Sequence, residues 1–129
     1  KQGMDAAFIC TGEPTGMAVG AAQILEEKGI SCGVVSMHSL RPFDKQALIE
    51  TAKNCKALIT VEEHCVFGGL GSLCASILMQ EEIHPFFRIV GIPDAPTVTG
   101  SQQEVFQHYG ISPESLADSM AALLSKKAK

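Results

Sequence analysis

Aromatic residues and positive charge are both scarce in this 129-residue sequence, and each shortage argues against a class of function. There is no tryptophan and a single tyrosine, and the formal net charge is −4. A basic surface interleaved with aromatic side chains, as nucleic-acid-binding proteins present, is therefore not expected. Apolar runs all fall short of the roughly 20 residues that a membrane-spanning helix needs. We expect neither a nucleic-acid partner nor a membrane partner.

Cysteine pairs with a recognisable spacing are also missing. The five cysteines are odd in number and none is spaced as Cys-x-x-Cys, so neither a disulfide framework nor a zinc site is expected. Free thiols in apolar surroundings are typical of a reducing compartment, which predicts a cytoplasmic protein. Apolar residues make up 46% of the chain and charged residues 19%, as in an ordinary globular protein, and the length fits a single domain over residues 1–129.

Short apolar runs alternate with segments of helical period along the chain. Strands are predicted at residues 6–10, 32–37, 57–61 and 86–92, and helices at 17–28, at 45–54, from Leu70, from Ser101 to Gly110, and from Pro113. Strands that recur at a spacing of roughly 25 residues, with helices between them, indicate βαβ units. The predicted fold class is α/β, a three-layer α/β/α arrangement around a mostly parallel open sheet of about four to five strands.

One stretch, residues 57–83, joins a buried strand to a helix through a polar, glycine-rich loop. Glu62, Glu63 and His64 follow the strand, and Gly68-Gly69-Leu70-Gly71-Ser72 opens the helix. In an open α/β sheet, strand carboxyl ends and helix starts are where ligands and partners usually bind. The loop amides could hold a phosphate or carboxylate, or the glycines could let the helix start lie close to a neighbouring backbone or subunit. The loop has neither a P-loop lysine nor the G-x-G-x-x-G spacing.

The polar residues at strand ends also allow more than one interpretation. Strand alternation places Glu62 and His64 on one side and Glu63 on the other, as an acid–base cluster or as a cap for loop amides. Arg41 could hold an anion or pair with a carboxylate across an interface. The candidate anion-binding or interface residues are Arg41, Glu62, His64, Gly68, Gly69, Gly71 and Ser72. No catalytic, cofactor-binding or metal-ligating residue is assigned, and Cys65 is not expected to be a nucleophile.

Residues 59–64, Ile-Thr-Val-Glu-Glu-His, followed by Gly68-Gly69-Leu70-Gly71-Ser72, resemble the signature of the transketolase C-terminal domain. Leu40-Arg41-Pro42-Phe43-Asp44 and Val90-Gly-Ile-Pro-Asp94 agree with this family, so the resemblance covers about residues 6–124. It implies the family's fold and a thiamin-diphosphate-dependent enzyme in which other domains bind the cofactor and Mg²⁺. The chain contains no Gly-Asp-Gly metal motif, and we expect it to be inactive alone.

The resemblance favours the C-terminal domain or subunit of a transketolase-type enzyme, a transferase of carbohydrate metabolism that moves two-carbon ketol units between sugar phosphates. The implied partners are N-terminal thiamin-diphosphate-binding domains or a subunit that carries them, within a homodimer. Two alternatives stay open: the same domain in a 1-deoxyxylulose-5-phosphate synthase or a 2-oxoacid dehydrogenase beta subunit, and a stand-alone regulatory module that binds a phosphorylated metabolite. Residues 1–5 are short for the extra edge strand that the family usually has, which predicts either a fragment or a subunit without that strand.

Overall fold

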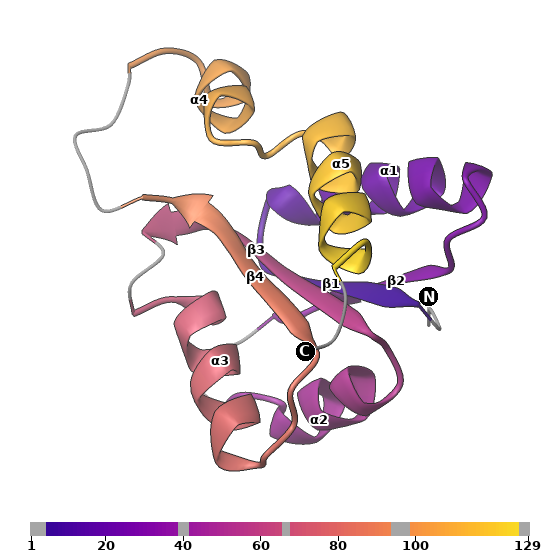
Figure 1. Cartoon of the computed structure of the whole chain (residues 1–129). Coiled ribbons are helices and arrows are strands. Elements are labelled where there is room, and N and C mark those ends of the chain that lie inside the picture. The colour runs from indigo at the N-terminus through magenta and orange to yellow at the C-terminus, as the bar shows by residue number, and fades with distance from the viewer. Residues whose placement is uncertain (1–4, 39–41, 66–67, 94–98, 127–129) are drawn as a thin grey trace.

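A computed structural model describes residues 5–38, 42–65, 68–93 and 99–126, without the side chains of His64 and Cys65. One sheet is covered by helices on both faces (Figure 1). In chain order, the elements are β1 (Ala6–Cys10), α1 (Pro14–Glu27), β2 (Cys32–Ser36), α2 (Lys45–Lys53), β3 (Ala57–Cys65), α3 (Leu70–Gln80), β4 (Phe86–Ile92), α4 (Gln102–His108) and α5 (Pro113–Leu124). The predicted α/β/α class is confirmed.

The sheet of the described residues has four strands in the order β2-β1-β3-β4, and every neighbouring pair is parallel. Ala6 of β1 lies beside Cys32 of β2 on one side and Ala57 of β3 on the other, so the inner strands run in step. The carboxyl ends of all four strands therefore lie at the same end of the sheet, and the candidate residues at the end of β3 lie there too.

Two hydrophobic clusters fill the space between the sheet and its helices. Phe8 and Cys10 belong to the cluster that contains α1 and α5 residues, whereas Ile9 belongs to the cluster that contains α2 and α3 residues. Because both faces of β1 are covered, all five of its residues are buried, which explains its continuous apolar sequence. The predicted inner face of α1 is confirmed for Ala18, Ala21, Ala22 and Leu25, which are buried, and Met17 packs against them half-buried.

Local capping signals fix several helix starts as predicted. The Oδ1 atom of Asp44 accepts a hydrogen bond from the Ala47 N–H at 3.0 Å and caps α2. Ser101 and Glu104 form a capping box at the start of α4. None of the helices in the described ranges combines the length and the apolar character that are required to cross a membrane.

The structure shifts two predicted boundaries by three or more residues. Helix α1 begins at Pro14 rather than at Met17, because proline fits the first turn of a helix, where its missing N–H is not needed. Strand β3 continues to Cys65 rather than ending at Val61, since after a register shift Cys65 again lies beside Ile92 of β4. The polar residues that the sequence analysis placed in a loop are therefore the last part of β3.

Helix α3 lies unusually close to the sheet at Gly71. A Cβ atom added to this residue would lie 2.5 Å from Cγ2 of Ile89 and 2.7 Å from Oγ1 of Thr60. Both neighbours belong to buried or half-buried strand positions, so neither can move away without disturbing the sheet. Only glycine permits this distance between helix and sheet.

We expect Gly71→Ala to lower the free energy of unfolding by about 1–3 kcal/mol, because the added methyl group overpacks the helix–sheet contact. Gly16→Ala is the matched control: nothing lies within 4 Å of its added Cβ, and alanine suits the interior of α1. This control should be neutral or stabilising by up to ~1 kcal/mol. Urea unfolding of both variants measures the difference, and equal stabilities would contradict the packing argument.

Candidate functional site

A buried carboxylate joins the end of β3 to the start of α3. Glu62 is 0% exposed; its Oε1 accepts a hydrogen bond from the Leu70 N–H at 2.9 Å, and its Oε2 accepts one from the Gly71 N–H at 2.8 Å. The residue that precedes the helix, Gly69, has no side chain to accept these bonds. Helix starts carry unpaired amides and a partial positive charge. Glu62 therefore caps α3 from a neighbouring strand.

The glycine loop is held by bonds within the chain. The two amides that the sequence analysis offered to a phosphate or carboxylate already bond to the carboxylate of Glu62. In addition, the Gly68 N–H donates to Oγ of Ser72 at 3.2 Å, and Gly68 has a φ of 78° that favours glycine. Together with the close approach of α3 to strand side chains at Gly71, this geometry supports the second interpretation of the glycines, in which they let the helix start lie close to a neighbour. Binding of an external anion by this loop stays a prediction.

Glu63 lies on the opposite side of β3, as strand alternation predicts. Its Oε2 accepts a hydrogen bond from Nε2 of Gln102 in α4 at 3.2 Å, and its Oε1 lies 3.4 Å from where a Cβ on Gly12 would stand. The residue therefore connects β3 to α4 and lies beside the turn after β1. Because Glu62 and Glu63 bond to different elements on different faces, the two carboxylates do not act as one acid–base pair.

Two of the candidate residues cannot be placed in this geometry. Arg41 lies outside the described residues, and so does the side chain of His64, whose backbone belongs to β3. The described ranges bring together no group of three or more His, Cys, Asp or Glu side chains that could hold a metal ion. Both oxygens of the buried Glu62 are already bonded to amides. Glu62 and the described residues of the glycine loop therefore do not fit a diphosphate with its Mg²⁺.

Burial keeps three of the described thiols protonated. It raises the pKa of Cys10 and of Cys74 to about 12, with smaller contributions from Cys32 and from the charge of Glu62 respectively. Burial likewise raises the pKa of Cys55 to about 11. The thiolate is the nucleophilic form of cysteine, so these three side chains are not nucleophiles near neutral pH.

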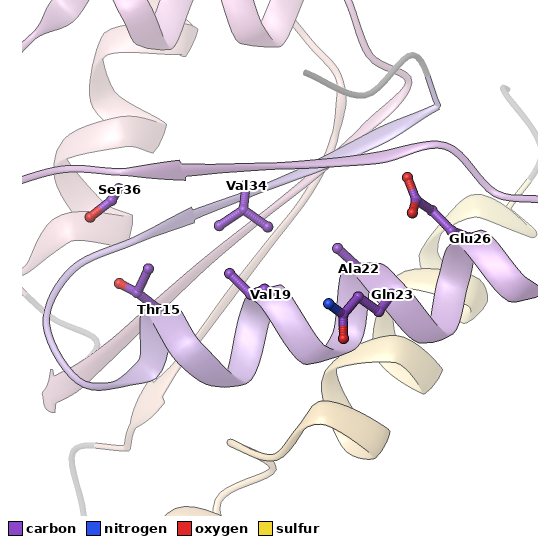
Figure 2. A pocket seen from close by; sticks show the side chains of 7 residues that line it. All are labelled: Thr15, Val19, Ala22, Gln23, Glu26, Val34 and Ser36. Carbon is purple, nitrogen blue, oxygen red and sulfur yellow. The ribbon is translucent and has the colours of Figure 1, made fainter. Parts of the chain in front are cut away.

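A separate pocket of about 350 Å³ lies between α1 and the outer strand β2. Figure 2 shows residues of α1 facing Val34 and Ser36 of β2 across it. Val19 in its wall is 44% exposed, and Oγ1 of Thr15 is buried without a hydrogen-bond partner among the described residues. The sequence analysis missed this pocket, because its wall consists of ordinary helix and strand residues whose pattern signals no site.

The comparison with known proteins identifies the family. Residues 1–116 match the model of the family described as "Transketolase, C-terminal domain". The chain belongs to this family. The resemblance to this family that the sequence indicated is thereby confirmed.

Individual relatives are longer than this transketolase C-terminal domain. It is 37% identical over 124 residues to a subunit of the apulose-4-phosphate transketolase of Phocaeicola vulgatus, and the match covers 96% of this chain and 39% of that protein. It is 35% identical over 117 residues to the 1-deoxy-D-xylulose-5-phosphate synthase of Heliobacterium modesticaldum, and this match covers 91% of this chain and 18% of that protein. A solved structure of a split gene transketolase, an inactive beta4 tetramer, has a TM-score of 0.86 at 36% identity and covers 99% of this chain and 41% of that chain.

The contacts of the two glutamates could be found only in part from sequence. Helix α3 starts after Gly69 and has no Ser, Thr, Asp or Asn cap, so its first amides need another acceptor. The acidic residues upstream of the helix were the sequence signal for that acceptor. The contact between Glu63 and Gln102 had no comparable signal, because the two residues lie 39 positions apart.

We expect Glu62→Gln to lower the free energy of unfolding by about 1–3 kcal/mol, because an amide group accepts through one atom only and leaves a buried N–H unpaired. Glu63→Gln is the matched control, since its bond to Gln102 is exposed and should contribute less than about 1 kcal/mol. Thermal and urea unfolding compare the two. Equal losses would show that Glu62 is not the cap that α3 needs.

The raised thiol pKa values predict a loss of stability in alkali. An unfolded thiol ionises near its ordinary pKa of 9.0, whereas folded Cys10 stays protonated up to about 12. Its contribution is therefore complete below pH 9.0 and is lost as the pH rises toward 12, by up to about 1.4 kcal/mol per pH unit for each such thiol. Urea unfolding at several pH values above 9.0 should give a shallower decline for Cys10→Ala. An unchanged slope would contradict this assignment.

Proposed function

We propose that this chain is the C-terminal assembly domain of a transketolase-type enzyme that moves two-carbon ketol units between sugar phosphates. The observation that carries the proposal is the family match over residues 1–116 in a chain that spans only 39% of one relative and 41% of another. Thiamin diphosphate and Mg²⁺ are then bound by N-terminal domains or by a separate subunit. When bound, the cofactor supplies the carbanion chemistry of the transfer.

The proposed surface for those partner domains is the end of the sheet at which the strands reach their carboxyl ends. Gly68 is exposed and Gly69 and Ser72 are half-buried, so these residues are accessible to a partner. Glu62 and Gly71 are buried and act indirectly, by fixing the start of α3 behind the loop. The sequence predicts that Arg41 and His64 contribute to the same surface, because each follows a predicted strand; Arg41 and the side chain of His64 lie outside the described residues.

The complete enzyme is proposed to be a cytoplasmic homodimer. Cys10, Cys32 and Cys74 are buried and not bridged, which is consistent with a reducing compartment. A second candidate function is the same assembly role in a 1-deoxyxylulose-5-phosphate synthase, since a relative with that activity in its name is 35% identical. The two candidates differ in substrate, which the partner domains select.

The test combines the 129-residue chain with the thiamin-diphosphate-binding polypeptide of its natural enzyme and measures both binding and ketol transfer. We expect activity only from the combination. Gly69→Leu should weaken binding at least tenfold, because it adds bulk to the proposed interface. Gly69 has a φ of −100° and a ψ of −156°, an extended conformation that other residues can adopt, so this variant should still fold. Measured affinity that is unchanged by Gly69→Leu would contradict the proposed interface.

Two controls accompany this experiment. Gly16→Leu adds the same side chain on α1, where nothing lies within 4 Å of an added Cβ, and should bind normally. A thermal-shift series on the chain alone tests the regulatory alternative with thiamin diphosphate and Mg²⁺, sugar phosphates and inorganic phosphate. A ligand at 100 times its dissociation constant stabilises a fold by about 2.7 kcal/mol. Such a shift with a phosphorylated metabolite, without partner binding, would favour the stand-alone module.

A further inference from the structure

Two hollows lie next to each other at the end of the sheet where the strands begin. The first has a volume of about 470 Å³ and lies between the last residues of α2 and the start of β4. The second has a volume of about 280 Å³ and lies between the end of α3 and β4. Residues 83–85 connect α3 to β4, line both hollows and form a ridge between them (Figure 1). The surface proposed for the cofactor-binding partner lies at the opposite end of the sheet.

The first hollow is basic. Lys53, Lys56 and His84 are among its lining residues, and no carboxylate of the described residues is. Lys53 forms no hydrogen bond or ion pair within the described part of the chain, and Nζ of Lys56, whose side chain is 75% exposed, lies 3.7 Å from Oδ1 of Asp5. The ring of His84 has an N–H to donate whether it is neutral or protonated. These groups are complementary to a negatively charged ligand.

The acidic residues at the end of α3 line neither hollow. Glu81 forms an ion pair with Lys45, with 2.6 Å between Oε1 and Nζ, and Glu82 is exposed. The hydrogen bond from Lys45 is the main reason that the pKa of Glu81 is lowered, and the charge of Lys53 contributes least. The formal net charge of the whole chain is −4, so the positive charge of the basic hollow is a local feature.

The second hollow is an apolar groove. Buried Leu78, half-buried Phe87 and exposed Met79 are among its lining residues. Met79 is 67% exposed, a larger fraction than the 44% of Val19, which is also a large apolar residue at the surface of the described ranges. Methionine is flexible and adapts its shape to the groups that it contacts. Covering this groove with an apolar side chain removes apolar surface from water on both partners.

Backbone hydrogen bonds hold the ridge between the two hollows in place. The Glu82 N–H donates to the Met79 carbonyl oxygen at 3.2 Å, and the Ile83 N–H donates to the Leu78 carbonyl oxygen at 3.0 Å. Glu82 has a φ of 57°, in the left-handed region that usually follows the end of a helix. Pro85 restricts the backbone further. The basic hollow and the apolar groove therefore keep a fixed spacing, which lowers the entropic cost of binding one ligand across both.

We propose that an extended segment of another protein, with an acidic and an apolar residue two positions apart, binds across this ridge. Residues two positions apart in an extended chain point to the same side, so both side chains can face this domain. The carboxylate lies in the basic hollow beside Lys53 and Lys56. The apolar side chain lies in the groove beside Met79 and Phe87. A basic segment would be repelled by the two lysines, and a nucleic acid would leave the apolar groove uncovered.

This site is independent of the proposed function. None of its residues is among those assigned to the surface for the cofactor-binding partner, and its tests use the 129-residue chain without that partner. Loss of peptide binding with intact assembly would overturn this inference alone. Loss of assembly with intact peptide binding would overturn only the proposed interface.

The first experiment selects binders from a library of random linear peptides, with the unmodified chain as bait. We expect enrichment of peptides with an acidic and an apolar residue two positions apart. Residue-resolved amide chemical shifts then map the selected peptides, and the shifts should change at Lys56, His84 and Phe87. Selection of no peptide, selection of basic peptides, or shift changes confined to the end of the sheet where the strands stop would overturn the proposal.

The second experiment tests the basic hollow by reversing one charge. Lys53 is exposed in the last turn of α2, and Lys28 is exposed at the end of α1 and lines neither hollow. We expect Lys53→Glu to weaken binding of a selected peptide at least tenfold and Lys28→Glu to leave it unchanged. Added salt should weaken binding to the unmodified chain more than binding to Lys53→Glu, because it screens the exposed charges. Equal affinities of the two variants would contradict the assignment.

The third experiment tests the apolar groove with a matched pair of exposed residues. Met79→Ser removes apolar surface from the groove, and Val19→Ser removes it from α1, away from the ridge. We expect only Met79→Ser to weaken peptide binding, again at least tenfold, and both variants to unfold at the temperature of the unmodified chain. Sedimentation identifies the remaining occupant: self-association that Met79→Ser abolishes would assign this surface to a second copy and overturn the proposal.

Discussion

Two hydrogen bonds, from the Leu70 and Gly71 N–H groups to the carboxylate of Glu62, hold together the end of β3 and the start of α3, and the rest of the candidate site depends on them. A buried carboxylate without partners would cost several kcal/mol, so its oxygens need donors that are fixed in place. The start of α3 provides two aligned amides, and it lacks a cap of its own. Strand and helix thus satisfy each other, and this fixes where the glycine loop is presented.

The same contact determines how closely α3 approaches the sheet. With the helix start held by Glu62, Gly71 lies against Ile89 and Thr60 without room for a methyl group. One face of β4 is thereby packed against α3. The rigid contact of Glu62 with α3 thus belongs to a chain that spans about two fifths of the length of the relatives it matches.

Local sequence signals predicted much of this fold and failed at identifiable places. The bounds of β1 and β4 agree with the structure because each is an apolar run between turn residues, and the caps at Asp44 and at Ser101 involve residues three positions apart. The predicted end of β3 at Val61 was wrong, because the charged residues that follow were taken to end the strand. Glu62 continues it, because a distant helix supplies partners for the charge.

The sequence by itself determined the family and the succession of strands and helices along the chain. Periodicity, caps and a short motif depend only on residues that are close along the chain. Only the tertiary structure decided that Glu62 and Glu63 serve different elements, that the loop amides have an internal partner, and that β4 forms an edge. These features join residues 8, 9 and 39 positions apart or depend on the order of strands in the sheet. Such pairings follow from how the whole chain packs, which no local pattern encodes.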